Sequence, residues 1–530
     1  MAKAIANGKK VSRSKGAGAR DSKMAQAKKS LKKPLKKPPA RAARGKAATS
    51  GARAVLAARL NPQVSLQAQP GGALAACFND YAIELGTFSA RAIDAAEALH
   101  DGLPLSFLAK ADALTREVHR LAKRLAMFGL MEFPFAQGDS ELFVIEPQTA
   151  DYWPEPTRIG GADNIVLSRF AYMRRRGDEL VLESPRSRAL FRVSAPIAAA
   201  LAILSDPQPV RKLRELASFP GDDLLGLLLD SQILFKVDAR REDGRRGEGD
   251  DDLVLWDFHD LLFHTRSTEG RHANPLGGVY PHVDHIAPLP AVRPPWKGQR
   301  IELTPSQAAQ HQPASPFATL LQARHSVRDY DDARPITAAE LATLLERTAR
   351  VRTTWDSDDF GPDGPVLTYT SRPYPSGGSA YELELYLAIA KCDGLASGFY
   401  HYDASAHALV RLDVAQQQVD QMIGAAVYAM DAETSPQVLV TIAARFGRVS
   451  WKYASLAYSL ILKDVGVLTQ TLYLAATDMG LGGCAIGTGN IEQFADVTKL
   501  AFHVEGPVGH FALGRPAPQA TEPPNMTTHD

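Results

Sequence analysis

The spacing of apolar residues divides the first part of the chain into segments of different character. Large apolar residues are rare in residues 1–60. Residues 75–150 contain two Ala- and Leu-rich stretches, Ala90–Leu99 and Ala111–Leu130, whose apolar positions lie three and four residues apart. That spacing puts apolar side chains on one face of a helix. It predicts a mostly helical unit over 75–150.

Residues 165–237 show a different order of elements. Two short β-like runs come first, three helical stretches follow and a strand closes the unit, at Leu180–Glu183, Leu190–Val193, Ala195–Leu204, Pro209–Leu216, Asp222–Leu229 and Ile233–Val237. This order predicts a small winged-helix unit. Such units bind DNA in many proteins and leader peptides in peptide-modifying enzymes, and the fold alone does not choose between these functions.

The second half of the chain begins with a Pro-rich connecting segment, residues 253–316, that lacks strong periodicity. Helix and strand patterns then alternate clearly over residues 317–516. Within this region Thr337 and Glu340 form a capping box ahead of an apolar helical pattern, which marks the start of a helix. The alternation predicts an α+β domain over 317–516.

Two elements of that domain are marked most strongly. Apolar residues alternate strictly from Tyr381 to Ile389, with Glu382 and Glu384 on the opposite face, as in a strand with one buried side. Helical spacing runs from about Leu456 to Met479 and stops at a cluster of glycines, which predicts a long buried helix.

Charge separates the first 60 residues from the rest. They carry 18 Lys and Arg against one acid, Asp21, whereas the remaining residues carry 42 Lys and Arg against 58 acids. The few apolar residues of this basic tail bury too little surface to offset the entropy cost of ordering the chain. The tail is therefore expected to be disordered. The tail resembles basic tails that contact nucleic acid, but most charge runs are only solvated. Nucleic acid is therefore not expected as a partner of the rest of the chain.

Several classes of protein are not indicated. No apolar stretch follows the basic start, and no run of about 18 apolar residues occurs, so neither a secretory signal nor a membrane span is expected. Cys77, Cys392 and Cys484 form no close pair, which favours a reducing cytoplasm over a disulfide framework. His282 and His285 have possible ligand spacing but no Cys or His-Glu frame nearby, so no metal site is predicted. No phosphate-binding Gly loop of the ATP or dinucleotide type occurs.

Two short motifs have the chemistry to hold a flat ligand that carries a phosphate. Arg324, Ser326 and Arg328 offer two guanidinium forks and a hydroxyl, which suit phosphate oxygens and a polyol chain. Pro375-Ser376-Gly377-Gly378 precedes a strand, and glycine lets backbone approach a flat ligand without an intervening Cβ. Each motif alone also suits a surface arginine pair or an ordinary turn.

Two further motifs complete the set, Gly480-Leu481-Gly482-Gly483 and Leu513-Gly514-Arg515-Pro516. In this order the four motifs resemble the flavin-binding framework of the nitroreductase superfamily. The closest resemblance is to its SagB-type (McbC-like) branch, the dehydrogenases that oxidise azoline rings in ribosomal peptides. The resemblance covers about residues 253–516. It implies an FMN domain of α+β fold, with a mixed, largely antiparallel sheet flanked by helices, that forms a homodimer with FMN at the interface.

The resemblance also implies roles for individual residues. The residues expected to hold the phosphate and ribityl chain are Arg324, Ser326, Arg328 and Arg515, and those expected to line the flavin ring are Ser376, Gly377, Gly378 and Gly487.

Lys452-Tyr453 resembles the Lys-Tyr pair that SagB-type dehydrogenases carry just before the dimer helix, where both residues are tied to catalysis. The chemistry is plausible, because oxidising an azoline sends a hydride to the flavin and a proton to a base. The family usually continues with Gly and then two arginines, whereas this chain reads Ala454-Ser455-Leu456.

Three functions follow from this pattern. The first is an FMN-dependent dehydrogenase that converts thiazolines or oxazolines in a peptide to thiazoles or oxazoles, with a possible cyclodehydratase partner and with residues 165–237 clamping a leader peptide. The second is an NAD(P)H-dependent reductase of nitro compounds or quinones. The third is a non-enzymatic winged-helix binding protein with a degenerate flavin domain, which the missing family arginines keep open.

Overall fold

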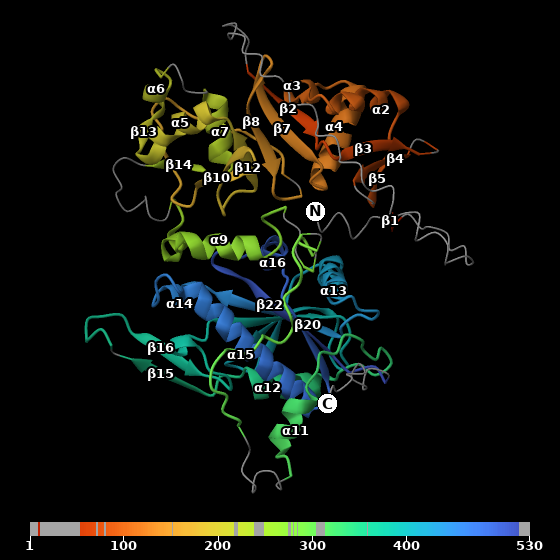
Figure 1. Cartoon of the computed structure of the whole chain (residues 1–530), viewed down its shortest axis with the longest axis vertical. Coiled ribbons are helices and arrows are strands. Elements are labelled where there is room, and N and C mark those ends of the chain that lie inside the picture. The colour runs from red at the N-terminus through yellow and green to blue at the C-terminus, as the bar shows by residue number, and fades with distance from the viewer. Residues whose placement is uncertain are drawn as a thin grey trace.

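The computed structural model describes residues 9–10, 54–69, 71, 73–78, 81–150, 152–216, 221–237, 248–273, 277–278, 280–283, 285–303, 313–357 and 359–518. Two bodies are stacked along the long axis, with helix α9 (Phe258–Ser267) between them (Figure 1). Most of the tail expected to be disordered lies outside the described residues. Its boundary at residue 60 was wrong, because Val55–Leu60 form strand β2, which pairs with two neighbouring strands.

The described part of the N-terminal body contains three antiparallel sheets, the smallest of which has three strands and is described below. Seven strands form the largest one, in the order β10 (Tyr172–Arg176), β11 (Glu179–Glu183), β12 (Ala189–Val193), β8 (Ser140–Pro147), β7 (Met131–Gln137), β2 and β6 (Leu103–Pro104). Four strands form the second one, in the order β1 (Lys9–Lys10), β5 (Tyr81–Thr87), β4 (Ala73–Phe78) and β3 (Val64–Ala68).

The unit over 75–150 is not mostly helical. The two expected helices are present as α2 (Ala90–Ala96) and α4 (Ala113–Met127), with the short α3 (Leu105–Leu108) between them. Strands β4, β5, β7 and β8 fill much of the remainder. Short apolar runs such as β7 carry no periodicity that separates a strand from a helix, and here pairing with neighbouring strands decides the outcome.

The elements expected over 165–237 form, but not as a separate unit. Three helices and a three-stranded sheet are present: α5 (Ala195–Leu201), α6 (Val210–Leu213), α7 (Asp222–Asp230), and strands β13 (Gln208–Pro209), β9 (Asn164–Leu167) and β14 (Leu234–Val237). The two earlier runs became β11 and β12, which join β8 in the large sheet. One apolar core therefore extends from Ala58 to Leu234 and unites the two predicted units.

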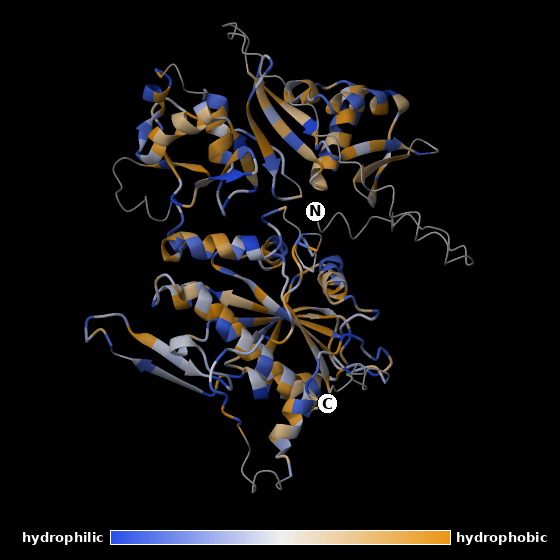
Figure 2. Ribbon diagram, in the orientation of Figure 1, coloured by the Kyte–Doolittle hydropathy of each residue, from blue (hydrophilic) through white to orange (hydrophobic). Residues whose placement is uncertain are grey.

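The C-terminal body is an α+β domain, as the sequence predicted. Its six-stranded sheet has the order β19 (Ala408–Leu412), β18 (Gly398–Asp403), β17 (Leu383–Ile389), β20 (Val438–Arg445), β22 (Glu505–Gly514) and β21 (Gly482–Ile486). All five pairings of these described strands are antiparallel. In Figure 2 the central strands and the helices against them carry most of the apolar colour.

Helices cover both faces of this sheet. The long helix α15 (Ala457–Asp478) and α12 (Ala338–Thr348) pack on one face against the alternating leucines of β17. The opposite face is covered by α13 (Gln416–Met430) and α16 (Ile491–Thr498). The capping box at the start of α12 is confirmed, with Thr337 and Glu340 bonded to each other's backbone N–H groups.

Smaller elements surround this body. They are α11 (Pro316–Ala323), the short helix α14 (Gly447–Ser450), the single turn η6 (Gly377–Ser379) and a hairpin of β15 (Thr353–Ser357) and β16 (Leu367–Ser371) that projects from one side (Figure 1). The segment expected only to connect, 253–316, also contains α9, which follows a 3-10 turn, η5 (Asp251–Leu255).

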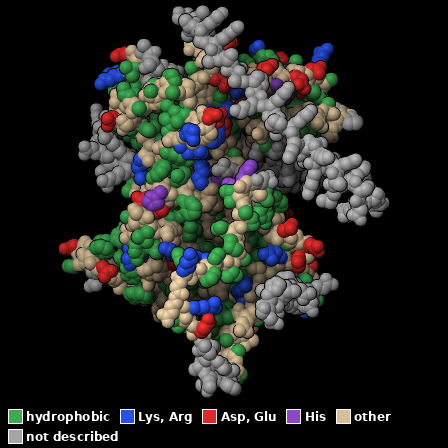
Figure 3. All heavy atoms as spheres, in the orientation of Figure 1, with side chains coloured by type: hydrophobic (Ala, Val, Ile, Leu, Met, Phe, Trp, Pro, Cys, Tyr) green, Lys and Arg blue, Asp and Glu red, His purple; other side chains and the backbone are tan. Residues whose placement is uncertain are grey.

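The surface gives two general observations. Among the described residues no helix combines the length and the apolar character needed to cross a bilayer. On the face drawn in Figure 3 basic and acidic side chains are interspersed among apolar ones, with no continuous patch of one charge on the part of the chain that the structure describes.

Candidate active site

The first motif lies beside the third at the edge of the six-stranded sheet. Val327 N–H donates to the carbonyl oxygen of Gly483 at 2.9 Å. A Cβ on Gly482 would lie only 2.6 Å from Cγ1 of Val327, so a side chain there would push the segments apart. Gly482 therefore serves the packing of protein against protein.

The fourth motif also lies beside the first. Tyr330 and Pro516 form a β-bridge, and Asp331 N–H donates to the carbonyl oxygen of Arg515 at 2.9 Å. The Arg515 guanidinium donates to both carboxylate oxygens of Glu340 at 2.8 Å. Arg515 thus stabilises the start of α12, and a role in phosphate binding requires it to share its donors with Glu340.

The Arg-x-Ser-x-Arg residues gather around Tyr473 of α15. The Tyr473 and Ser326 hydroxyls are hydrogen bonded at 2.9 Å, and Tyr473 also accepts the N–H of Ala485 at 2.7 Å. The Arg324 guanidinium lies 5.1 Å from the centre of the Tyr473 ring, and Arg328 is exposed. Among the described residues neither arginine forms an ion pair with a carboxylate, so both remain available to an anion.

Gly487 follows β21 at this same edge of the sheet. It is exposed, and a Cβ placed on it would meet nothing within 4 Å. The protein alone therefore does not require glycine at this position, and the space beside it is open.

The Pro-Ser-Gly-Gly loop is fixed to α15 by a buried carboxylate. Oδ2 of Asp464 accepts hydrogen bonds from the Ser376 hydroxyl at 2.9 Å and from Gly377 N–H at 2.8 Å. The Ser376 oxygen in turn accepts the N–H of Tyr381 at 3.0 Å. Asp464 is 7% exposed, so these bonds lie away from water, where leaving a donor or acceptor unpaired is costly.

Glu382 lies beneath the same loop, although the sequence pattern put it on the polar face of the strand. Its side chain is 0% exposed, because the loop and α15 cover this end of β17. Burial raises the pKa of Glu382 to about 7, and the neighbouring Asp464 carboxylate acts in the same direction. Within the described residues its Oε1 has no hydrogen-bond partner.

The structure brings Lys452 and Tyr453 against this loop. Lys452 Nζ donates to the carbonyl oxygen of Gly378 at 3.4 Å. Gly378 has a positive φ of 59°, and a Cβ on it would lie 2.2 Å from the Tyr453 hydroxyl oxygen and 3.0 Å from Lys452 Nζ. Position 378 therefore excludes any side chain, both by its conformation and by the closeness of this pair.

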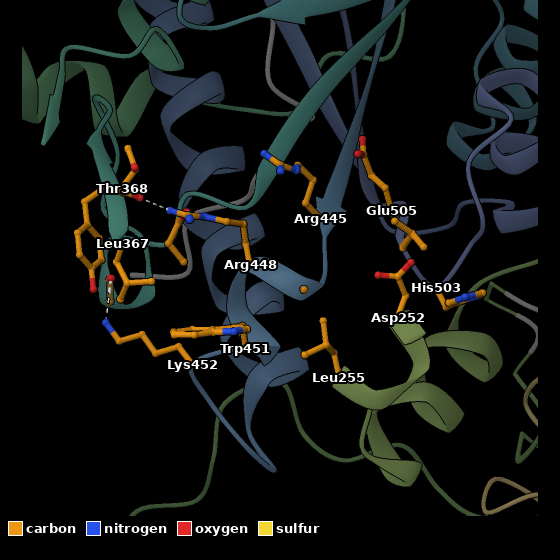
Figure 4. Close-up of a pocket in the computed structure, with 15 residues that line it drawn as sticks. Asp252, Leu255, Leu367, Thr368, Arg445, Arg448, Trp451, Lys452, His503 and Glu505 are labelled. Carbon is orange, nitrogen blue, oxygen red and sulfur yellow. Dashed lines mark hydrogen bonds between the residues drawn. The ribbon is translucent and has the colours of Figure 1, made fainter. Parts of the chain in front are cut away.

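A cavity of about 330 Å³ opens beside the pair. Lys452 and Trp451 lie side by side at one end, whereas Arg445 and Glu505 lie together at the other (Figure 4). Glu505 accepts the Tyr386 hydroxyl at 2.6 Å, and burial raises the pKa of its carboxyl group. The cavity thus has basic and acidic groups at the end opposite Lys452.

The predicted residues form two groups along α15, which we name for the helix residue that each contacts. The Asp464 end comprises Ser376, Gly377, Gly378, Lys452 and Tyr453, and the Tyr473 end comprises Arg324, Ser326 and Arg328. Nine residues of helix separate Asp464 from Tyr473, which corresponds to about 13–14 Å. Residues of the Tyr473 end do not line the cavity.

Three functional residues were missed by the sequence analysis: Asp464, Tyr473 and Glu382. The first two lie inside a helix whose apolar spacing indicated burial alone. Asp464 still left a signal, since a carboxylate at a buried helical position needs a partner. Glu382 left none, because alternation with Glu384 is the normal pattern of a solvent-facing strand side.

Comparisons with known proteins match two parts of the chain. Residues 321–515 match the model described as "Nitroreductase family", and residues 165–273 match the model described as "Cyanobactin oxidase ThcOx". A protein of Methanocaldococcus jannaschii that is named provisionally as a nitroreductase, MJ1384, is 28% identical over 182 residues, which are 33% of this chain and 81% of that protein.

Two solved structures are among those that match part of the chain. A chain of the Escherichia coli microcin synthetase McbBCD complex, with truncated pro-MccB17 bound, is 19% identical and covers 50% of this chain and 97% of its own, with a TM-score of 0.35. A protein from Ralstonia eutropha assigned provisionally to the nitroreductases is 23% identical and covers 41% of this chain and 88% of its own, with a TM-score of 0.30. At these scores the two likenesses carry no information about activity.

Proposed function

We propose that the chain is an oxidoreductase, an FMN-dependent dehydrogenase of the SagB type, and the match of residues 321–515 to the nitroreductase family model supports this proposal. It would convert thiazoline or oxazoline rings in a ribosomal peptide to thiazoles or oxazoles. The match of residues 165–273 to the cyanobactin oxidase model supports this branch over a general reductase. The observation that carries the proposal is the contact of Lys452 and Tyr453 with Gly378 beside a cavity.

The residues of the Tyr473 end fit the phosphate end of FMN. Two arginines without carboxylate partners, among the described residues, flank a serine hydroxyl, and this donor set suits a phosphate and a ribityl chain. Arg324, Ser326 and Arg328 are therefore proposed as the main ligands of the phosphate and ribityl chain, with Arg515 as a neighbour that must share its bonds with Glu340.

Of the glycines proposed to line the flavin ring, Gly487 fits a flat ligand best, because the space beside it is open. The Cβ positions of Gly377 and Gly378 face protein atoms, so these two glycines also serve the packing of the loop. Ser376 is the fourth residue of this set, and its hydroxyl is held by Asp464.

A second copy of the chain is proposed to complete the site, because one chain holds its two groups about 13–14 Å apart along α15. Two features leave room for a partner.

Gly466, in the middle of α15, is exposed with nothing within 4 Å of an added Cβ. Glycine costs about 1 kcal/mol inside a helix, a cost that close approach of another helix would explain. The apolar helix α11 has no buried residue, and Phe317 on it is 60% exposed.

The reaction removes two hydrogen atoms from neighbouring ring atoms of the azoline. FMN, when bound, would accept one of them as a hydride. Lys452, which lines the cavity, or Tyr453, whose hydroxyl lies beside Gly378, would take the other as a proton. A lysine can act as this base when it is neutral, and a tyrosine when it is ionised. Formation of the second ring double bond then balances the loss of the hydride and the proton.

The N-terminal body is proposed to bind the leader segment of the substrate through residues 165–237. An upstream cyclodehydratase is the partner that would supply the azoline. A photo-reactive leader peptide should crosslink to residues 165–237, whereas crosslinks confined to the C-terminal body would contradict this assignment.

The test of the main proposal begins with the visible spectrum of the purified protein and the mass of any released flavin. An azoline peptide incubated with the FMN-loaded protein should lose the mass of two hydrogen atoms per ring. Lys452→Ala should retain FMN and lose at least about a hundredfold in turnover, since general bases contribute about 10²–10⁴-fold. Lys297→Ala, an exposed lysine of the connecting segment, is the matched control. A Lys452→Ala protein with full turnover would exclude the assigned role.

Reduction of nitro compounds or quinones by NAD(P)H is the second candidate. The 28% identity to the provisional nitroreductase of Methanocaldococcus jannaschii favours it. Rapid bleaching of the flavin by a nicotinamide, together with broad use of acceptors and no conversion of azoline peptides, would place this function first.

A further inference from the structure

The backbone that follows the Lys452–Tyr453 pair is strained. Ser455 has a φ of +62°, in the left-handed region that residues with a side chain rarely adopt. It lies two residues after Tyr453 and two before α15 begins at Ala457. Ser455 and its neighbours Ala454 and Leu456 are exposed, so burial in the core does not impose this conformation.

Two side chains from a distant segment hold both polar backbone groups of Ser455. Oδ2 of Asp257 accepts the N–H of Ser455 at 2.6 Å. Nε2 of His259 lies 3.2 Å from the Ser455 carbonyl oxygen, and because a carbonyl can only accept, this nitrogen donates. Asp260, beside His259, accepts the N–H of Tyr458 at 3.3 Å in the first turn of α15.

Asp257, His259 and Asp260 each have an oxygen or nitrogen that could bind a metal ion, and these atoms lie within 4.8 Å of one another. Each one is bonded to backbone between Ser455 and Tyr458. The group is thereby explained as a backbone clamp without a metal.

The clamp is attached to a rigid support. Trp256 Nε1 donates to the carbonyl oxygen of His503 at 2.7 Å, and Leu261 is fully buried against the C-terminal body. At the other end of α9, Arg266 forms an ion pair with the buried Glu183 of the N-terminal body at 3.0 Å. A support fixed at both ends can hold a strained backbone that would otherwise relax.

We propose that Asp257 and His259 are positioning residues that fix the Tyr453–Leu456 segment and thereby hold Lys452 at the cavity and Tyr453 beside Gly378. This inference rests on the proposed catalytic role of that pair. The side chains of Asp257 and His259 act through the backbone of Ser455 and touch no substrate. Asp257 and His259 lie at the start of α9, which is between the two bodies. The conformation of the Tyr453–Leu456 segment therefore depends on residues that precede the 317–516 domain in the chain.

Single and rescue variants test the clamp. Asp257→Ala and His259→Ala should each lower kcat about ten- to a hundredfold with little change in KM or in FMN content, because a displacement of about 1 Å can cost a hundredfold. Asp257→Asn and His259→Gln should retain most of the activity, since each keeps an acceptor or a donor. Ser455→Gly in the Asp257→Ala background should restore turnover, because glycine adopts a positive φ without support. Asp251→Ala, an exposed acid in the preceding turn, is the matched control.

Hydrogen exchange of the peptide that covers residues 452–458 provides a readout independent of activity. Asp257→Ala should speed exchange in this peptide, because the Ser455 N–H loses its acceptor. Exchange should stay fast when Ser455→Gly is added, because glycine does not restore that acceptor. Unchanged exchange, or faster exchange with unchanged kcat, would overturn the positioning role. If wild-type protein with FMN converts no azoline, the proposed function fails, whereas faster exchange in Asp257→Ala would still establish the clamp itself.

Discussion

The two ends of the candidate site are built in opposite ways. At the Asp464 end two carboxylates are buried, Asp464 at 7% and Glu382 at 0% exposure, and Asp464 is hydrogen bonded to the loop, whereas Lys452 is exposed. At the Tyr473 end Arg328 is exposed, and among the described residues neither it nor Arg324 has a carboxylate partner. A site that positions reacting groups needs rigid support, whereas a site that captures an anion needs cations that are still free.

Because the two ends differ in this way, substitutions at each end should affect different measured properties. A change at the Asp464 end should disturb folding and turnover together, because its contacts hold a loop to a core helix. A change at the Tyr473 end should lower affinity for an anion and leave the fold intact. The following variants test this contrast, from the largest expected effect to the smallest.

Gly378→Ala should have the largest effect. A methyl group at this position would lie 2.2 Å from the Tyr453 hydroxyl oxygen on a backbone whose φ is +59°. We expect turnover to fall by more than about a hundredfold through displacement of the pair. The free energy of unfolding should fall by about 1–3 kcal/mol through strain. Denaturation curves and azoline turnover measure the two effects, and Gly424→Ala, a helical glycine with open space around its Cβ position, is the control.

Glu382→Gln should change the pH dependence of stability. The pKa of Glu382 is raised from 4.5 to about 7, so its folded form binds the proton more tightly than the unfolded chain. Its contribution to stability is complete below pH 4.5 and is lost as the pH rises through about 7. The neutral glutamine should therefore make the protein more stable than wild type near pH 8.5, by up to about 3 kcal/mol, with no such gain near pH 4.5.

Denaturation measured at several pH values checks this expectation. Asp496→Asn, which neutralises an exposed carboxylate on α16, is the control for general effects of charge. A constant difference between Glu382→Gln and wild type across this range would contradict the sign derived above.

Asp464→Ala should destabilise the loop. It removes the acceptor of two hydrogen bonds, from Ser376 and Gly377, in a buried place. We expect a loss of about 2–3 kcal/mol in the free energy of unfolding, since each unpaired buried group costs about 1–3 kcal/mol. Asp464→Asn keeps one acceptor oxygen and should lose less. Equal losses in the two variants would show that packing, and not hydrogen bonding, holds the loop.

Arg328→Ala should have the smallest effect on the fold. We expect FMN affinity to fall about tenfold, or about 1.4 kcal/mol, with no measurable change in stability, since the side chain is exposed and supports no other residue. Titration with FMN followed by fluorescence measures the affinity, and Arg352→Ala, another exposed arginine, is the control. If Arg328→Ala destabilised the protein as much as Asp464→Ala, the contrast between the two ends would be lost.

Local order could be predicted from the sequence where neighbouring residues decide it. The capping box of Thr337 and Glu340, the long helix α15 and the strand β17 are confirmed, although β17 is buried on both faces and not on one. Each depends on contacts within a few residues, which spacing and side-chain type encode directly. The resemblance of the four motifs to the nitroreductase superfamily is confirmed for residues 321–515. The roles of the individual site residues remain predictions.

Tertiary structure alone decided which polar groups meet. The strands within 75–150 depend on pairing with distant segments. Glu382 is buried because a loop and a helix cover it. The hydrogen bond between Asp257 and Ser455 joins residues that are 198 positions apart. Sequence spacing defines the face of an element on which a residue lies, but it does not define what packs against that face. The sequence thus determined the elements that neighbouring residues encode and the side chains available to a site, while the packing of the two bodies decided which groups are buried, paired or left free.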